Sequence, residues 1–227
     1  MTVAMHMSDG LVNAPTSLAF GLLAALVLAV AVRRARVDLD DRTAPMAGLV
    51  TAFVFAVQMI NFPILPGASG HLLGGALVAI LVGPWVGSLC IAIVLIVQSI
   101  LFADGGLTAL GLNVTNMAIV GVFTGYLVAR SLRGIARRSR RGLVAVAFVA
   151  AFANTVVASL AFVVEYAVGG AGGAGLGTVF ALMVGLHALI GIGEGLITAA
   201  TVGAVAGTRP DLIYLLRQPA RVTGSAA

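Results

Sequence analysis

Residues 72 to 103 read LLGGALVAILVGPWVGSLCIAIVLIVQSILFA, an almost unbroken apolar stretch of 32 residues. A helix that spans a membrane needs about 20 residues, so this stretch is too long for one helix and short for two. Glycine and proline interrupt helices, and we therefore expect a hairpin that turns at Gly83-Pro84. Its first arm would be short, which is tolerated where protein rather than lipid surrounds it.

The composition of the whole chain agrees with a membrane protein. Of 227 residues, 60% are hydrophobic and only 9% are charged, which is typical of an integral membrane protein and excludes an ordinary soluble domain. We expect one membrane domain over residues 1–227, in the plasma membrane. The lone Cys90 lies in an apolar run, so a small buried hydrophobe is its expected role. The other apolar runs are 14–32, 44–60, a run ending near 129, 143–168 and 178–206.

The positive charges predict how these runs cross the membrane. All 13 basic residues are arginines, and they fall at 33–42 (four), 130–141 (six) and 209–221 (three). Cytoplasmic loops are enriched in arginine, so an even number of crossings should separate these segments. That holds only if residues 72–103 cross twice. We predict an all-α bundle of seven transmembrane helices, with the amino terminus outside and the carboxy terminus inside, and no nucleic acid as partner.

Two of the three histidines then lie on the outer side. His6 stands in MHMSDG, residues 5–10, with two thioethers and a carboxylate close by, and His71 precedes the hairpin. Imidazole and amine nitrogens suit intermediate divalent metals, and thioethers suit Cu(I). A solvated histidine near a terminus is the other interpretation. The residue types indicate a possible metal site but do not identify the metal.

Four motifs in order resemble one known family. They are MHMSDGLVNAP (5–15), NFPILPGASGHLLGGALVAILVGPWVG (61–87), QSILFADGGLTALGLNVTNMAIVG (98–121) and GLHALIGIGEGLIT (185–198). The chain is similar to the cobalt/nickel-binding membrane component, of the CbiM or NikM type, of energy-coupling factor (ECF) transporters. The resemblance implies six core helices plus an extra amino-terminal helix, and Co²⁺ or Ni²⁺ as the transported ligand. It also implies a transmembrane coupling subunit and ATPase subunits as partners, and it allows a small accessory membrane subunit. The membrane lipid is a further expected partner.

The resemblance further implies which residues hold the metal. In the family the terminal amine, the next amide and its imidazole supply three nitrogens, and a loop histidine supplies a fourth. Carried over, the ligands are Met5, His6 and His71. Four nitrogens in a plane suit Ni(II), Cu(II) or low-spin Co(II), rather than Zn(II) or Mg(II).

One departure from the family pattern concerns the start of the chain. Four residues, MTVA, precede Met5 here, and a peptide nitrogen is a far poorer ligand than an amine. We expect the active chain to begin at Met5, which intact mass would test. A metal-loaded chain that keeps residues 2–4 would instead point to His6, His71 and a thioether from Met5 or Met7.

Further polar residues have two interpretations each. They could orient the histidines, or they could cap helices and bond between them: Asn61, Ser69, Gln98, Asn113, Thr115 and Asn116. Asp9 either anchors the amino-terminal segment or is solvated. His187 and Glu194 lie seven residues apart, on one helical face, and we expect an intramembrane polar network rather than metal ligation.

Small residues four apart on helix 44–60, namely Gly48, Ala52 and Ala56, allow a close helix contact. The resemblance assigns such a face to the coupling subunit, although packing within the bundle is an equal alternative, and Ala25 and Ala29 share the spacing. No Walker A, GxSxG or HExxH pattern is present, so we expect a binding component and no enzyme. The alternative function is an autonomous secondary transporter or channel that uses His187 and Glu194 as a relay.

Overall fold

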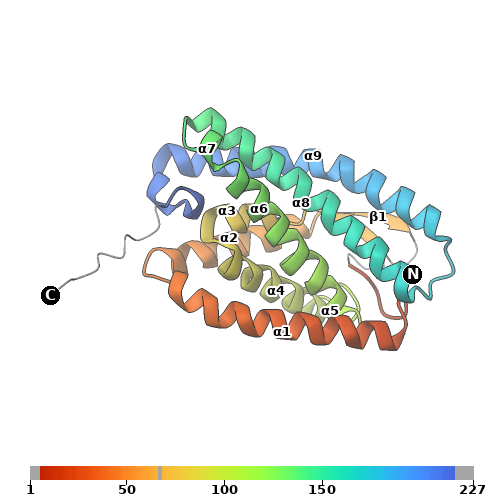
Figure 1. Cartoon of the computed structure of the whole chain (residues 1–227). Coiled ribbons are helices and arrows are strands. Elements are labelled where there is room, and N and C mark those ends of the chain that lie inside the picture. Colours follow the sequence, from red (N-terminus) through yellow and green to blue (C-terminus); the bar gives the residue numbers. More distant parts are fainter. Residues whose placement is uncertain (1–5, 66–67, 218–227) are drawn as a thin grey trace.

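A computed structural model describes residues 6–65 and 68–217. Within these ranges the chain is mostly helical, and its one sheet is a two-stranded hairpin. The long helices lie side by side as a bundle (Figure 1). The helices are α1 (Ala14–Asp38), α2 (Thr43–Gln58), α3 (Gly75–Val82), α4 (Pro84–Leu101), α5 (Leu110–Asn113), η1 (Val114–Gly121), α6 (Val122–Ser131), α7 (Arg133–Ala136), α8 (Arg140–Gly169), α9 (Leu176–Thr208), η2 (Pro210–Leu212) and η3 (Tyr214–Leu216); the strands are β1 (Asn61–Leu65) and β2 (Ala68–His71).

Among the described helices, five are long and apolar enough to cross a membrane: α1, α4, the continuous helix 110–131, α8 and α9. The outward face of α1 carries exposed leucines at positions 18, 22 and 26. A soluble protein seldom exposes apolar surface of this extent, whereas lipid tails cover it in a bilayer. The prediction of an all-α, multi-pass membrane bundle is confirmed.

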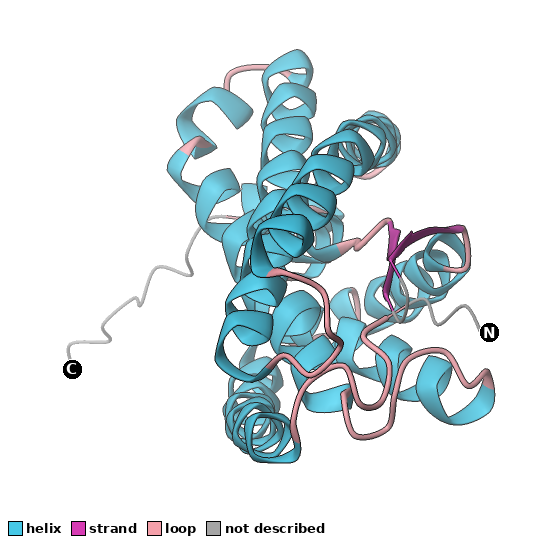
Figure 2. Ribbon diagram, turned by 90° about the vertical axis from the view of Figure 1, so that its right-hand side faces the viewer, coloured by secondary structure: helices cyan, strands magenta, loops and turns pink. Residues whose placement is uncertain are grey.

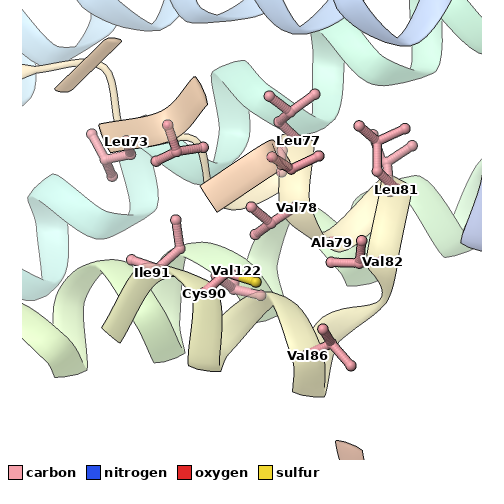
Figure 3. Packing of buried hydrophobic residues seen from close by; sticks show 14 of the residues in the cluster. Leu73, Leu77, Val78, Ala79, Leu81, Val82, Val86, Cys90, Ile91 and Val122 are labelled. Carbon is pink, nitrogen blue, oxygen red and sulfur yellow. The ribbon is translucent and has the colours of Figure 1, made fainter. Parts of the chain in front are cut away.

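The apolar stretch 72–103 forms the predicted helical hairpin. Gly83 has φ of 91°, a conformation that favours glycine, and Pro84 begins α4. Helix α3 has 8 residues, all of them buried, so its length is only about 12 Å. Protein surrounds this short arm, as expected. Figure 3 shows the side chains of α3 and α4 packed together, with the predicted buried thiol of Cys90 among them.

The segment before this hairpin differs from the sequence expectation. Its prolines and glycines predict a loop, but residues 61–65 and 68–71 form antiparallel strands in which Asn61 pairs with His71. Figure 2 shows the two strands at the edge of the helical bundle. Strand pairing depends on contacts that local turn signals do not encode. Its consequence is that His71 ends an ordered strand.

The arginine-rich segments gather at one end of the bundle. The Arg217 guanidinium donates a hydrogen bond to the Thr43 hydroxyl at 2.9 Å, and Arg133 donates one to the Arg217 carbonyl. Arg140 donates to the carbonyl of Gly203. In Figure 1 this end, marked by α7, lies opposite the end that carries β1. The shared end is what the positive-inside argument requires, and the orientation in the membrane stays a prediction.

Candidate metal site

The amino-terminal segment is docked into the bundle rather than extended away from it. The Met7 amide donates to the Asn113 side-chain oxygen at 3.0 Å, and the Asn113 amide group donates back to the Met7 carbonyl at 3.2 Å. The Gly106 amide also donates to this carbonyl, at 3.0 Å. These bonds join the segment to helix α5 and to the loop before it. They hold the preceding residue, His6, inside the protein.

Two neighbouring contacts strengthen this docking. The Asp9 carboxylate accepts a hydrogen bond from the Thr108 amide at 2.8 Å, which anchors the segment to the loop after α4. Gly105 has φ of 88°, and a Cβ added there would lie 2.9 Å from the Cβ of His6. The loop therefore needs glycine at this position, both for its backbone conformation and for the close approach of His6.

His6 and His71 meet although 64 residues separate them in the sequence. Their ring centroids lie 4.5 Å apart, with an angle of 56° between the rings. Both side chains are almost completely buried. One reaches this point from the docked segment and the other from the end of β2. The structure thus brings together the two histidines that the sequence places on the same side of the membrane.

Hydrogen bonds orient the two rings. His6 Nδ1 lies 3.3 Å from the Asp104 carboxylate, and His71 Nδ1 lies 2.9 Å from the Leu72 carbonyl. A carbonyl oxygen only accepts, so His71 Nδ1 carries the proton and His71 Nε2 keeps its lone pair. Within the described residues, His6 Nε2 is buried and makes no hydrogen bond. Oxygen-held Nδ1 and free Nε2 is the usual arrangement of metal-binding histidines.

Burial also keeps one ring in its metal-binding form. Burial, with a smaller contribution from the His6 imidazole, lowers the pKa of His71 well below its usual range. The imidazole is therefore neutral at ordinary pH. A neutral ring is the form that binds a metal ion.

The two rings border a small cavity of about 40 Å³. This is room for one water-sized ligand or a metal ion. The remaining walls come from α8, α9 and the helix that contains Asn113, and they combine an imidazole, thioethers and side-chain amides with apolar groups. The lining residues that bear nitrogen, oxygen or sulfur side chains are His6, His71, His187, Met7, Met117, Met183, Asn113, Asn116 and Ser159.

A known protein family matches nearly the whole chain, including all the residues of this site. The family model described as the cobalt uptake substrate-specific transmembrane region, CbiM, matches residues 6–212. The chain belongs to this family.

Individual relatives agree. The chain is 39% identical to a putative fused nickel transport protein NikMN of Archaeoglobus fulgidus, over 96% of this chain and 71% of that protein. It is 30% identical to a cobalt transport protein CbiM of Sorangium cellulosum, over 94% of this chain and 96% of the relative. A solved structure of a truncated transition metal transporter superposes with a TM-score of 0.83 at 28% identity, covering 89% of this chain and 99% of the other.

His187 and Glu194 have different surroundings in this CbiM-family chain. His187 lines the cavity, and its Nδ1 donates to the Met183 carbonyl at 2.7 Å, one turn earlier on α9. Glu194 accepts hydrogen bonds from the backbone that follows His71. Within the described part of the chain the two side chains share no hydrogen bond. Each of the two predicted polar residues has its own set of hydrogen-bond partners inside the bundle.

The other predicted residues divide between cavity and scaffold. Asn113 and Asn116 line the cavity, whereas Gln98 contacts the Met59 sulfur at 4.0 Å and the Thr115 hydroxyl donates to its own helix. Met5 lies outside the described residues, as do the side chains of Asn61 and Ser69. The small residues Gly48, Ala52 and Ala56 are exposed, as are Ala25 and Ala29. The stripe on α2 is therefore free of packing within the described bundle.

Several residues near the cavity were not predicted from sequence. Asp104 bonds His6, Met117 and Met183 line the cavity, and Glu165 accepts a 2.7 Å hydrogen bond from Asn116. A carboxylate inside an apolar run is costly in a membrane, so Glu165 carried a usable signal. Asp104 carried none, because its role depends on how the loop after α4 folds.

The described residues alone do not complete a metal centre. Among them, His, Cys, Asp and Glu side chains form no group of three that could hold a metal ion. The two facing imidazoles are the pair of nitrogen donors that the described residues bring together here.

Proposed function

We propose that this chain is the substrate-binding membrane component of an ECF-type transporter, and that it captures Ni²⁺ or Co²⁺ on the outer face of the membrane. The observation that carries the proposal is the facing pair of His6 and His71, with ring centroids 4.5 Å apart at the edge of a cavity. Family membership already makes the chain a multi-pass membrane protein of cobalt or nickel transport and not an enzyme.

The ligand set that we propose consists of His6, His71 and Met5. His71 offers Nε2, His6 offers an imidazole nitrogen, and the segment around Met5 and His6 would add main-chain nitrogen. Four nitrogens favour Ni(II), Cu(II) or low-spin Co(II) over Zn(II), which prefers a tetrahedral set that often includes thiolates. Asn113 and Asp104 support the site because they hold Met7 and the His6 ring.

The outer location rests on the charges at the opposite end. The arginine segments meet beside α7, which the positive-inside rule assigns to the cytoplasm. The docked amino-terminal segment and β2 lie at the other end (Figure 1). Metal would therefore enter the cavity from outside the cell.

The proposed partners are a transmembrane coupling subunit, ATPase subunits and a small accessory membrane subunit. The sequence has no nucleotide-binding motif, so the energy for transport would come from other chains. The exposed small residues Gly48, Ala52 and Ala56 offer a surface on α2 that another helix could approach closely.

An autonomous carrier with His187 and Glu194 as a proton relay is less well supported. The two share no hydrogen bond in the described part of the chain, and Glu194 already accepts hydrogen bonds from four donors. Its oxygens are occupied by the scaffold.

Metal uptake in cells tests the proposed function. Cells that express this chain with a matching coupling subunit and ATPase should accumulate radioactive nickel or cobalt, and His71→Ala should abolish this uptake. An inactive ATPase should abolish it as well, because we propose that this subunit supplies the energy. Uptake by this chain alone, driven by a proton gradient and lost with Glu194→Gln, would instead establish the autonomous carrier.

A further inference from the structure

Glu194 is a buried carboxylate in the middle of α9 whose two oxygens accept four hydrogen bonds. One oxygen accepts from the Leu73 amide at 2.7 Å and the Thr155 hydroxyl at 2.8 Å. The other accepts from the Gly74 amide at 3.0 Å and the Asn154 side chain at 2.8 Å. A carboxylate inside a membrane protein is costly unless donors surround it. Here the donors come from α8 and from the segment between β2 and α3.

That segment directly follows His71 and is held from two helices. Glu194 of α9 accepts hydrogen bonds from the Leu73 and Gly74 amides, and the Gln58 side chain of α2 donates to the Leu73 carbonyl at 2.7 Å. Gly74 has φ of 78°, and a Cβ there would lie 2.7 Å from a methyl group of Val54. The backbone therefore cannot shift without losing buried hydrogen bonds. Each buried donor or acceptor that loses its partner costs free energy.

The His71 ring is tied to the same segment. Its Nδ1 donates to the Leu72 carbonyl, which directly precedes the Leu73 amide that Glu194 holds. The position of the Leu72 carbonyl sets the direction in which His71 Nε2 points. A chain of contacts thus runs from Glu194 through the backbone to the free nitrogen of the proposed ligand.

We propose that Glu194 is the positioning residue for His71, and that it makes the site selective for ions that need a fixed arrangement of nitrogens. This inference rests on the proposed function and adds to it a residue that does not itself touch the metal. A firmly held His71 favours Ni(II), whose preferred geometry is demanding. It favours Zn(II) less, because Zn(II) has no geometric preference from d electrons and adapts to a loosened ligand.

The conservative variant is Glu194→Gln. It keeps the volume of the side chain but replaces one acceptor oxygen with an NH₂ group that faces donors, and it removes the charge that strengthens these bonds. Substitution of a group that orients a ligand typically costs 10–100-fold in metal affinity. We expect a loss of about that size for Ni(II) and a clearly smaller loss for Zn(II).

The experiment compares the purified full chain with E194Q, His71→Ala and Val202→Ala. Val202 is a fully buried residue on the same helix, two turns closer to the arginine end, so V202A loosens packing without contact with the segment after His71. Competition titrations give the Ni(II) and Zn(II) affinities, and thermal unfolding of the metal-free proteins gives their stability. Amide hydrogen exchange reports on Leu73 and Gly74.

The expected result is that E194Q lowers the ratio of Ni(II) to Zn(II) affinity and speeds exchange at Leu73 and Gly74. V202A should lower the thermal midpoint but leave that ratio unchanged. An unchanged ratio in E194Q, with H71A strongly impaired, overturns the positioning role while the proposed function stands. Unchanged Ni(II) binding in H71A overturns the proposed function itself. Should E194Q fail to fold, Thr155→Val removes one of the four donors, and normal Ni(II) selectivity in T155V overturns the inference.

Discussion

Asn113 offers the sharpest test of how the amino-terminal segment is held. Its side chain makes two hydrogen bonds to the Met7 backbone, at 3.0 and 3.2 Å, next to the proposed ligand His6. Asn113→Ala removes both. The Met7 carbonyl keeps its bond from the Gly106 amide, but the Met7 amide is left without an acceptor in the described structure. The change therefore acts on docking rather than on the ligands.

The magnitude follows from these bonds. A buried amide that loses its partner costs about 1–3 kcal/mol, so we take about 2 kcal/mol as the loss in docking free energy. At about 1.4 kcal/mol per factor of ten, the ratio of docked to undocked segment falls roughly 30-fold. Metal binds only the docked form in this account, so the apparent affinity falls with the docked fraction. We expect a loss in Ni(II) affinity of about 3- to 30-fold, with the larger value if docking is marginal without metal.

The assay is a competition titration of the purified chain with Ni(II). Asn13→Ala is the matched control, because Asn13 caps α1 through a 3.0 Å bond to the Thr16 amide and does not line the cavity. That loss should cost about 1 kcal/mol of stability and leave affinity unchanged. Equal Ni(II) affinity in N113A and wild type, together with unchanged amide exchange at Met7, would refute the docking argument.

Three further predictions concern other parts of the protein. Asp104→Asn should lower Ni(II) affinity roughly 10–100-fold, because a neutral amide orients the His6 ring less well; an unaffected titration would contradict this. His187→Ala should cost less than either His6→Ala or His71→Ala in the same titration, since its Nδ1 serves its own helix. A reporter fused after Arg141 should read as cytoplasmic, and an extracellular signal would disprove the predicted orientation.

Much of the fold could be predicted because the bilayer sets the length of apolar runs and the side on which arginines gather. The length of 72–103 and its break at Gly83-Pro84 were sufficient to predict the hairpin. The arginine positions predicted that three segments share one side of the membrane, and hydrogen bonds join these segments at one end of the bundle. The strands at 61–65 and 68–71 were not predicted, because the prolines and glycines there indicate turns, while strand pairing depends on a partner elsewhere in the chain.

The site was predictable in part, and for a different reason. His6 and His71 were identified by position and by resemblance, not by local chemistry. Helical spacing placed His187 and Glu194 on one face, which α9 bears out as geometry, but spacing cannot tell which segments lie opposite that face. His187 faces the cavity, whereas Glu194 reaches the backbone after His71. Asp104 could not be predicted, because only the folding of the loop after α4 brings it to His6.

The most direct test of the central claim is equilibrium metal binding by the purified chain and its two histidine variants. We expect the wild-type chain to bind one Ni(II) or Co(II), and His6→Ala and His71→Ala each to lose more affinity than the roughly 10–100-fold typical of supporting residues. Wild-type affinity in both variants would contradict the proposed ligands and place the metal elsewhere.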